Sequence, residues 1–152
     1  MDFFTVPTVL FHVLLVFVVL AHDRRRILSI NVTSNPSAVW TANQIVRAFP
    51  WESAPRAPWQ SPCVERVIGT VRRELVDHTI VMNERHLRRL LCRYVSEYYH
   101  PCRTHLSLGK DAPESRAVEP PESGEVVELP VMGGLHHRTR GERRRGWATG
   151  RG

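Results

Sequence analysis

The sequence predicts an α/β protein in which about three antiparallel strands pack with about three helices. The N-terminal third is rich in Val, Phe and Leu and is broken by turn residues, as expected for short buried strands. The next part carries apolar residues at helical spacing, each time after residues that favour a helix N-terminus. With 152 residues, the chain has enough length for one modest core and a tail.

The expected strands lie at Phe3–Val6, within the apolar run from Val6 to Ala21, and at Ile27–Val32. The last of these alternates apolar and polar residues, which is typical of a strand with one buried face. The charged cluster His22–Arg26 reads as the hairpin turn that precedes it.

The apolar run also allows a second interpretation, a membrane anchor. Only Val13–Ala21 is uninterrupted, about nine residues, whereas a spanning helix needs about 20. Asp2 precedes the run, where a signal peptide would carry Lys or Arg. We therefore expect buried strands and no membrane partner, and a small membrane-associated protein remains the alternative.

Three helices are expected after these strands. Thr41 and Gln44 form a capping-box pattern that opens a short helix ending at Phe49. A second helix starts at Ser61, a good N-cap, and a third starts after Asn83. Their apolar stripes predict the core-facing sides, Val64, Val67, Ile68, Val71 and Leu75 in one helix and Leu87, Leu90, Leu91, Tyr94, Val95 and Tyr98 in the other.

A carboxylate stands in the first turn of the second helix, on a face that is otherwise basic. Glu65, Gly69 and Arg72 share this face, and Arg66 and Arg73 lie beside it. Such an arrangement could hold a divalent cation next to a phosphate backbone. A plainer interpretation stays open, in which Glu65 favours the helix N-terminus and the arginines form a solvated surface.

The C-terminal part is expected to be largely irregular. From Pro113 the chain is rich in Pro, Gly and charge, with at most one hairpin that pairs Val126–Leu129 with Met132–His136. From Arg138 onward we expect a disordered basic tail. The predicted division is a core over residues 1–112 and a tail over residues 113–152.

Several blocks resemble the insertion-sequence transposases of the retroviral-integrase superfamily. Residues 57–74 are similar to their last catalytic block. Residues 83–91, 98–108 and 112–114 are similar to the region that follows it. Residues 2–6 and 16–26 are similar to the first catalytic strand and the hairpin after it. The blocks occur in the family's order, so the resemblance is more specific than a short motif.

This resemblance implies a ribonuclease-H-like fold that cuts and joins DNA with two Asp and one Glu, which hold two Mg²⁺ ions. Asp2 matches the first Asp and Glu65 matches the Glu. No residue matches the second Asp, because Glu52 is the only acid between Val32 and Cys63. Ser61 also departs from the family, which commonly carries Asn there.

The unmatched Asp suggests that a block of the fold was lost. In relatives of this kind an Ala-Pro-Arg-like run flanks the block on both sides, and here one such run remains, Ala54–Arg56. A deletion between two similar stretches is therefore our hypothesis for the fold, which would be incomplete. Losing the strand that bears the Asp would leave Phe3–Val6 as an exposed apolar edge.

The resemblance predicts a remnant of a transposase or integrase whose catalysis is weak or absent. Asp2 and Glu65 are the expected catalytic and metal-binding residues, with Mg²⁺ or Mn²⁺ as the implied but weakly held cofactor. The net charge of +6 favours DNA as the partner, with intact transposase subunits as a further one, in the cytoplasm or on the nucleoid. A non-catalytic DNA-binding or interfering module is the alternative. The expected DNA contacts are Arg66, Arg72, Arg73, Arg85, Arg88 and Arg89.

Overall fold

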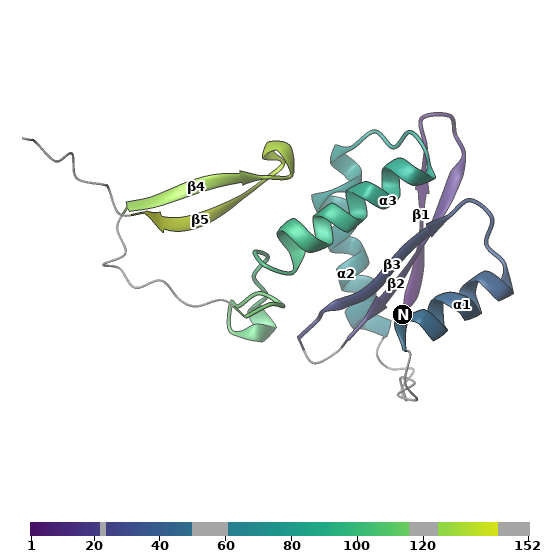
Figure 1. Ribbon diagram of the computed structural model, residues 1–152, viewed down its shortest axis with the longest axis horizontal. Helices are drawn as coiled ribbons and strands as arrows, with labels where there is room; N and C mark the ends of the chain where they lie inside the picture. The colour runs from purple at the N-terminus through teal and green to yellow at the C-terminus, as the bar shows by residue number, and fades with distance from the viewer. Residues whose placement is uncertain (22–23, 50–60, 116–124, 143–152) are drawn as a thin grey trace, which may run out of the picture.

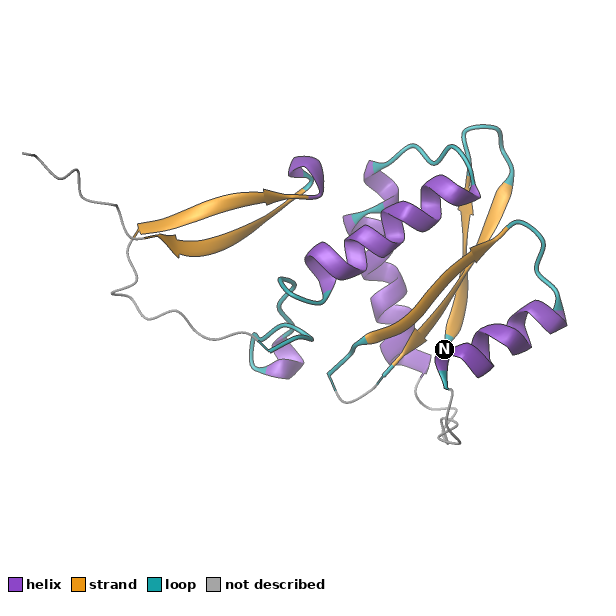
Figure 2. Cartoon of the chain, viewed as in Figure 1, coloured by secondary structure: helices purple, strands orange, loops and turns teal. Residues whose placement is uncertain are grey.

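The computed structural model describes residues 1–21, 24–49, 61–115 and 125–142. Its elements confirm the predicted mixed α/β class, with three antiparallel strands and three helices, and they add a separate two-stranded sheet (Figures 1 and 2). The strands are β1 (Asp2–Pro7), β2 (Val13–Leu20), β3 (Ile27–Thr33), β4 (Glu125–Val131) and β5 (His136–Glu142). The helices are α1 (Ala38–Ala48), α2 (Ser61–Glu74) and α3 (Glu84–Arg93).

The main sheet has the order β1-β2-β3 and is antiparallel throughout. Asp2 lies opposite Val18 across the first pair of strands, and Leu15 lies opposite Thr33 across the second. The central strand β2 is buried on both faces, which explains why its sequence is apolar without alternation. Among the described residues, β1 and β3 are the edges of this sheet.

Helices cover both faces of the main sheet (Figure 1). Leu14, Val16 and Val18 of β2 face α2 and α3 and belong to the central apolar cluster. On the other face, the ring of Phe17 contacts Trp40 of α1, with the ring centroids 6.4 Å apart. No helix among the described residues is both long and apolar enough to cross a membrane.

Helix α1 begins earlier than the capping-box pattern predicts. The hydroxyl of Ser37 accepts a hydrogen bond from the Trp40 N–H at 3.1 Å, so Ser37 and not Thr41 is the N-cap. Ser37 has the extended backbone that an N-cap requires, with φ −130° and ψ 157°. Gln44, the other residue of the predicted capping box, is instead buried.

The stripes predicted for α2 and α3 are confirmed. All five apolar positions of the α2 stripe are buried, and so are Leu87 and Leu91 of α3. Asn83 caps α3 as expected, because its side-chain oxygen accepts a hydrogen bond from the His86 N–H at 2.9 Å. Together with the inner face of the sheet, these side chains form the core.

Beyond Arg93 the helix continues as a π-helical turn over Tyr94–Tyr99. The His100 N–H bonds the Val95 carbonyl at 3.0 Å, which is the i→i+5 spacing of a π-turn. The extra residue rotates Tyr99 into the core, where it is fully buried. Tyr98, the last position of the predicted stripe, is half-buried and packs against the edge of the core.

The second sheet is a hairpin that is longer than predicted. Strands β4 and β5 turn at Met132–Leu135, where Gly133 and Gly134 take positive φ angles of 71° and 92°. The turn therefore lies later than expected, and residues 138–142 form strand instead of irregular tail. The side chain of His136 stacks on Tyr98, with ring centroids 3.8 Å apart, and so attaches the hairpin to the end of the last helix. Residues 143–152 lie outside the described residues.

Candidate functional site

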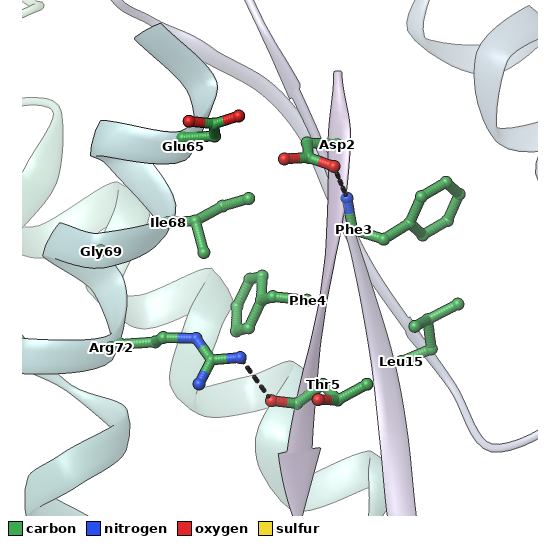
Figure 3. A pocket seen from close by; sticks show the side chains of 9 residues that line it. All are labelled: Asp2, Phe3, Phe4, Thr5, Leu15, Glu65, Ile68, Gly69 and Arg72. Atoms are coloured by element: carbon green, nitrogen blue, oxygen red, sulfur yellow. Dashed lines mark hydrogen bonds between the residues drawn. The ribbon is translucent and has the colours of Figure 1, made fainter. Parts of the chain in front are cut away.

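A pocket of about 450 Å³ lies between β1 and α2 (Figure 3). It is open to solvent. The pocket contains both carboxylates predicted from the sequence, although they are 63 positions apart in the chain. Its lining residues are Asp2, Phe3, Phe4, Thr5, Leu15, Glu65, Ile68, Gly69 and Arg72.

Asp2 reaches this pocket because side chains alternate along β1. Phe4 and Val6 are buried under α2, and Asp2 occupies the same face two residues earlier. Its Oδ1 accepts a hydrogen bond from the Phe3 N–H at 2.7 Å. That N–H therefore points away from β2, toward the open edge of the sheet.

Glu65 faces Asp2 from the first turns of α2. The helix runs in the same direction as β1, so its Glu65 end lies beside Asp2 and its Arg72 end lies beside Thr5 (Figure 3). Glu65, Gly69 and Arg72 share one face of α2, as their spacing predicts, and all three line the pocket. Figure 3 shows the two carboxylates directed into the same space.

Arg72 closes the other end of the pocket. Its Nη2 donates a hydrogen bond to the Thr5 carbonyl at 3.0 Å, and its guanidinium carbon lies 5.3 Å from the centroid of the Phe4 ring. Arg72 is also one of the predicted DNA contacts. Its side chain is exposed as well as bonded to the edge of β1, and its contact with DNA stays a prediction.

The acidic pair does not amount to a two-ion metal site. Within residues 1–21, 24–49, 61–115 and 125–142, no three His, Cys, Asp or Glu side chains are grouped so that they could hold a metal ion. Glu52, the only other acid in the stretch that should supply the second Asp, lies outside the described residues. Asp2 and Glu65 offer carboxylate oxygens, which suit Mg²⁺, but too few of them for a pair of ions.

Two more of the arginines predicted to contact DNA also have neighbours within the protein. Arg88 donates to the Val32 carbonyl at 2.9 Å and lies 3.4 Å from Glu84, so it joins α3 to β3. Arg73 folds back over Gly69, where an added Cβ would lie 3.3 Å from its Nη1. All six predicted arginines are exposed, these two included, and their contact with DNA stays a prediction.

A half-buried polar cluster that spacing alone did not predict holds α2 in place. Arg103 binds both carboxylate oxygens of Glu74, the last residue of α2, at 2.8 and 3.0 Å. The Tyr94 hydroxyl donates to the same carboxylate at 2.6 Å. Burial raises the pKa of Glu74, but the hydrogen bonds from Arg103 and Tyr94 outweigh it and hold that pKa below its usual range. The cluster thus fixes the helix that carries Glu65.

His105 lies at the edge of this cluster and is almost fully buried. Burial, and then the positive charge of Arg103, lower the pKa of His105 to about 4. The Arg103 Nη1 lies 3.2 Å from His105 Nδ1, so the neutral ring can accept a hydrogen bond there. The only sequence signal for this group was the resemblance of residues 98–108 to the family's post-catalytic region.

The comparisons with known proteins give a match to one family model over the middle of the chain. Neither the curated proteins nor the solved structures yield a significant match to the chain. Residues 51–113 match the integrase core domain, a segment that covers less than half of the chain and includes α2, α3, Glu65 and Arg103. Over this segment the chain is similar to the transposases and integrases.

Proposed function

We propose that the protein is a DNA-binding relative of transposases and integrases that does not itself cut or join DNA. The observation that carries this proposal is the pairing of Asp2 with Glu65 in one pocket. Two of the three carboxylates that the family implies are brought together from distant segments, and among the described residues no third acid joins them.

The arrangement around the pair supports an incomplete ribonuclease-H-like core. Three antiparallel strands come first, and the helix that bears Glu65 then packs beside the first strand. The open edge of β1 lies where a further strand, carrying the second Asp, would pair. The sequence lacks that Asp, which fits the loss of a block before residue 57.

The family implies divalent metals, but this donor set does not fit them as a catalytic pair. A two-metal mechanism needs ions about 3.5–4 Å apart, held by carboxylates that bridge and flank them. With only Asp2 and Glu65 at the pocket, we propose no catalytic step through a metal. Of the two activities that the family resemblance implies, DNA binding and DNA cleavage, we therefore propose only DNA binding.

DNA contact is supported by charge. The chain carries a net charge of +6, and Arg66 of α2 with Arg85 and Arg89 of α3 leave exposed guanidinium groups on the helical side of the core. Phosphate contacts of this kind release counterions, so binding weakens as salt rises. Binding of such a module to the DNA ends used by intact transposase subunits would make it an interfering partner.

The test is the salt dependence of binding to a duplex of mixed sequence. Replacing Arg85 and Arg89 together by Ala should flatten the slope of log K against log salt by about one unit per lost contact. The matched control replaces Arg26 and Arg47, two exposed arginines outside α2 and α3. Equal slopes in all three proteins, or an equal loss in the control, would assign binding to other parts of the chain and reject the proposed surface.

A further inference from the structure

We propose that two copies of this chain pair through the open edges of their β1 strands. The pairing is antiparallel and centred on Phe4, so that the two sheets become continuous. The proposal is independent of DNA binding. It rests on the hydrogen-bonding groups of this edge and on the distribution of charge along the pocket beside it.

Phe3 and Thr5 provide the backbone hydrogen-bonding groups along the open edge of β1. The Phe3 N–H is bound by the Asp2 carboxylate and the Thr5 carbonyl by Arg72, so neither group bonds β2. Backbone groups alternate in direction along a strand, so Phe3 and Thr5 are the β1 residues that present both their N–H and C=O outward. In an antiparallel pair centred on Phe4, Phe3 of each copy lies opposite Thr5 of the other and exchanges two hydrogen bonds with it.

The pocket has an acidic end and a basic end, so two antiparallel copies would place opposite charges next to each other. Asp2 and Glu65 form the acidic end, and Arg72 forms the basic end beside Thr5. A two-fold axis through Phe4 reverses this order in the second copy. Arg72 of each copy is thereby brought to the acidic end of the other, twice in the dimer. Complementary charge of this kind selects one orientation of a strand pair.

The groups that cap the edge in the single chain are the ones that the pair would use. Asp2 and Arg72 each satisfy one outward backbone group, and Arg72 is an exposed side chain whose bond is weakly held. In the pair, the Phe3 N–H and the Thr5 carbonyl would bond the second strand instead of Asp2 and Arg72. Each Arg72 side chain could then contact Asp2 of the other copy. Pairing would also cover part of Phe3, whose side chain is 38% exposed. A strand edge that has no partner strand among the described residues favours association.

The first experiment measures the mass of the untagged full chain in solution without DNA, by sedimentation velocity over a range of concentrations. We expect a monomer–dimer equilibrium. Arg72→Glu should raise the dissociation constant by about tenfold or more, because like charges then meet at both ends. Combining it with Glu65→Arg should restore much of the affinity. Arg89→Glu, an equal change of charge on α3, should leave the constant unchanged.

A second variant tests the backbone pairing without changing charge. Thr5→Pro removes an N–H that points away from β2, and Pro is tolerated at such positions on an edge strand. It should abolish the dimer while the thermal unfolding midpoint and circular dichroism stay those of the native chain.

A native chain that stays monomeric up to its solubility limit would overturn the proposal. A dimer that survives both Arg72→Glu and Thr5→Pro would overturn it as well, because another surface would then hold the two copies. An Arg89→Glu variant that dissociates as readily as Arg72→Glu would show that net charge alone controls association.

Discussion

Arg103 and Glu74 join the loop after the last helix to the C-terminal end of α2 through three hydrogen bonds between one guanidinium and one carboxylate. The contact spans 29 residues of sequence and is half-buried. Because α2 also carries Glu65, the geometry of the acidic pocket depends on an ion pair at the far end of the same helix.

Removing this ion pair should destabilise the fold. Arg103→Ala leaves Glu74 partly buried without its cation, so we expect the free energy of unfolding to fall by about 2–4 kcal/mol. Urea unfolding followed by circular dichroism measures it. Arg93→Ala is the control, because its ion pair with Glu97 is exposed and solvent-screened and should contribute much less to stability. Similar losses in both variants would contradict the structural role of Arg103.

The Tyr94 hydroxyl should act as part of the same cluster. Tyr94→Phe keeps the ring in the core but removes a hydrogen bond to a charged carboxylate, which should cost about 1.5–3 kcal/mol. When Tyr94→Phe is combined with Arg103→Ala, the two losses should not add, because both act on Glu74. Additive losses in the double-mutant cycle would show that the two residues act separately.

Stability should fall as the solution becomes acidic, because of His105. Its folded pKa of about 4 lies below its ordinary value of 6.5, so the unfolded chain binds the proton more tightly. The contribution is fully present above pH 6.5 and is lost as the pH falls toward 4. His100 and His136, whose pKa values are also lowered by burial, act in the same direction. Unfolding midpoints of His105→Gln should depend less on pH over this range, and an unchanged dependence would exclude His105.

The π-helical turn predicts that Tyr99 contributes more to the stability of the core than Tyr98. Tyr99 is fully buried, so Tyr99→Ala should cost about 3–5 kcal/mol through the cavity that it leaves. Tyr98→Ala should cost clearly less, because Tyr98 is half-buried and lies between the edge of the core and His136 of the hairpin. Thermal unfolding of the two variants decides between the π-turn and a regular helix, in which Tyr98→Ala would be the more damaging change.

The parts that could be predicted from the sequence depend on local patterns. The stripe from Val64 to Leu75 and the Asn83 cap follow from spacing and from one side-chain hydrogen bond near in sequence. The shared face of Glu65 and Arg72 follows in the same way. The joint placement of Asp2 and Glu65 was expected from the family resemblance alone, because residues 63 positions apart leave no local pattern.

The features that could not be predicted depend on tertiary contacts, or on a choice between two local residues that suit the same role equally well. Ser37 and Thr41 are both good N-caps, and the extended backbone at Ser37 decides between them. One extra residue in a helical turn moves Tyr99 into the core, and spacing rules assume that no such residue occurs. The bond from Arg72 to Thr5 joins residues 67 positions apart, so no local pattern could indicate it.

The central claim is that the Asp2–Glu65 pair lacks the acid it needs for DNA chemistry. The most direct test measures joining of labelled terminal-repeat DNA, with Mg²⁺ or Mn²⁺, by the native chain and by a repaired chain. The repair inserts between Arg56 and Ala57 the matching strand of an integrase core domain, with its Asp or with Asn in its place. We predict joining only by the chain that carries the inserted Asp. Joining by the native chain that is lost in Glu65→Gln would contradict the account.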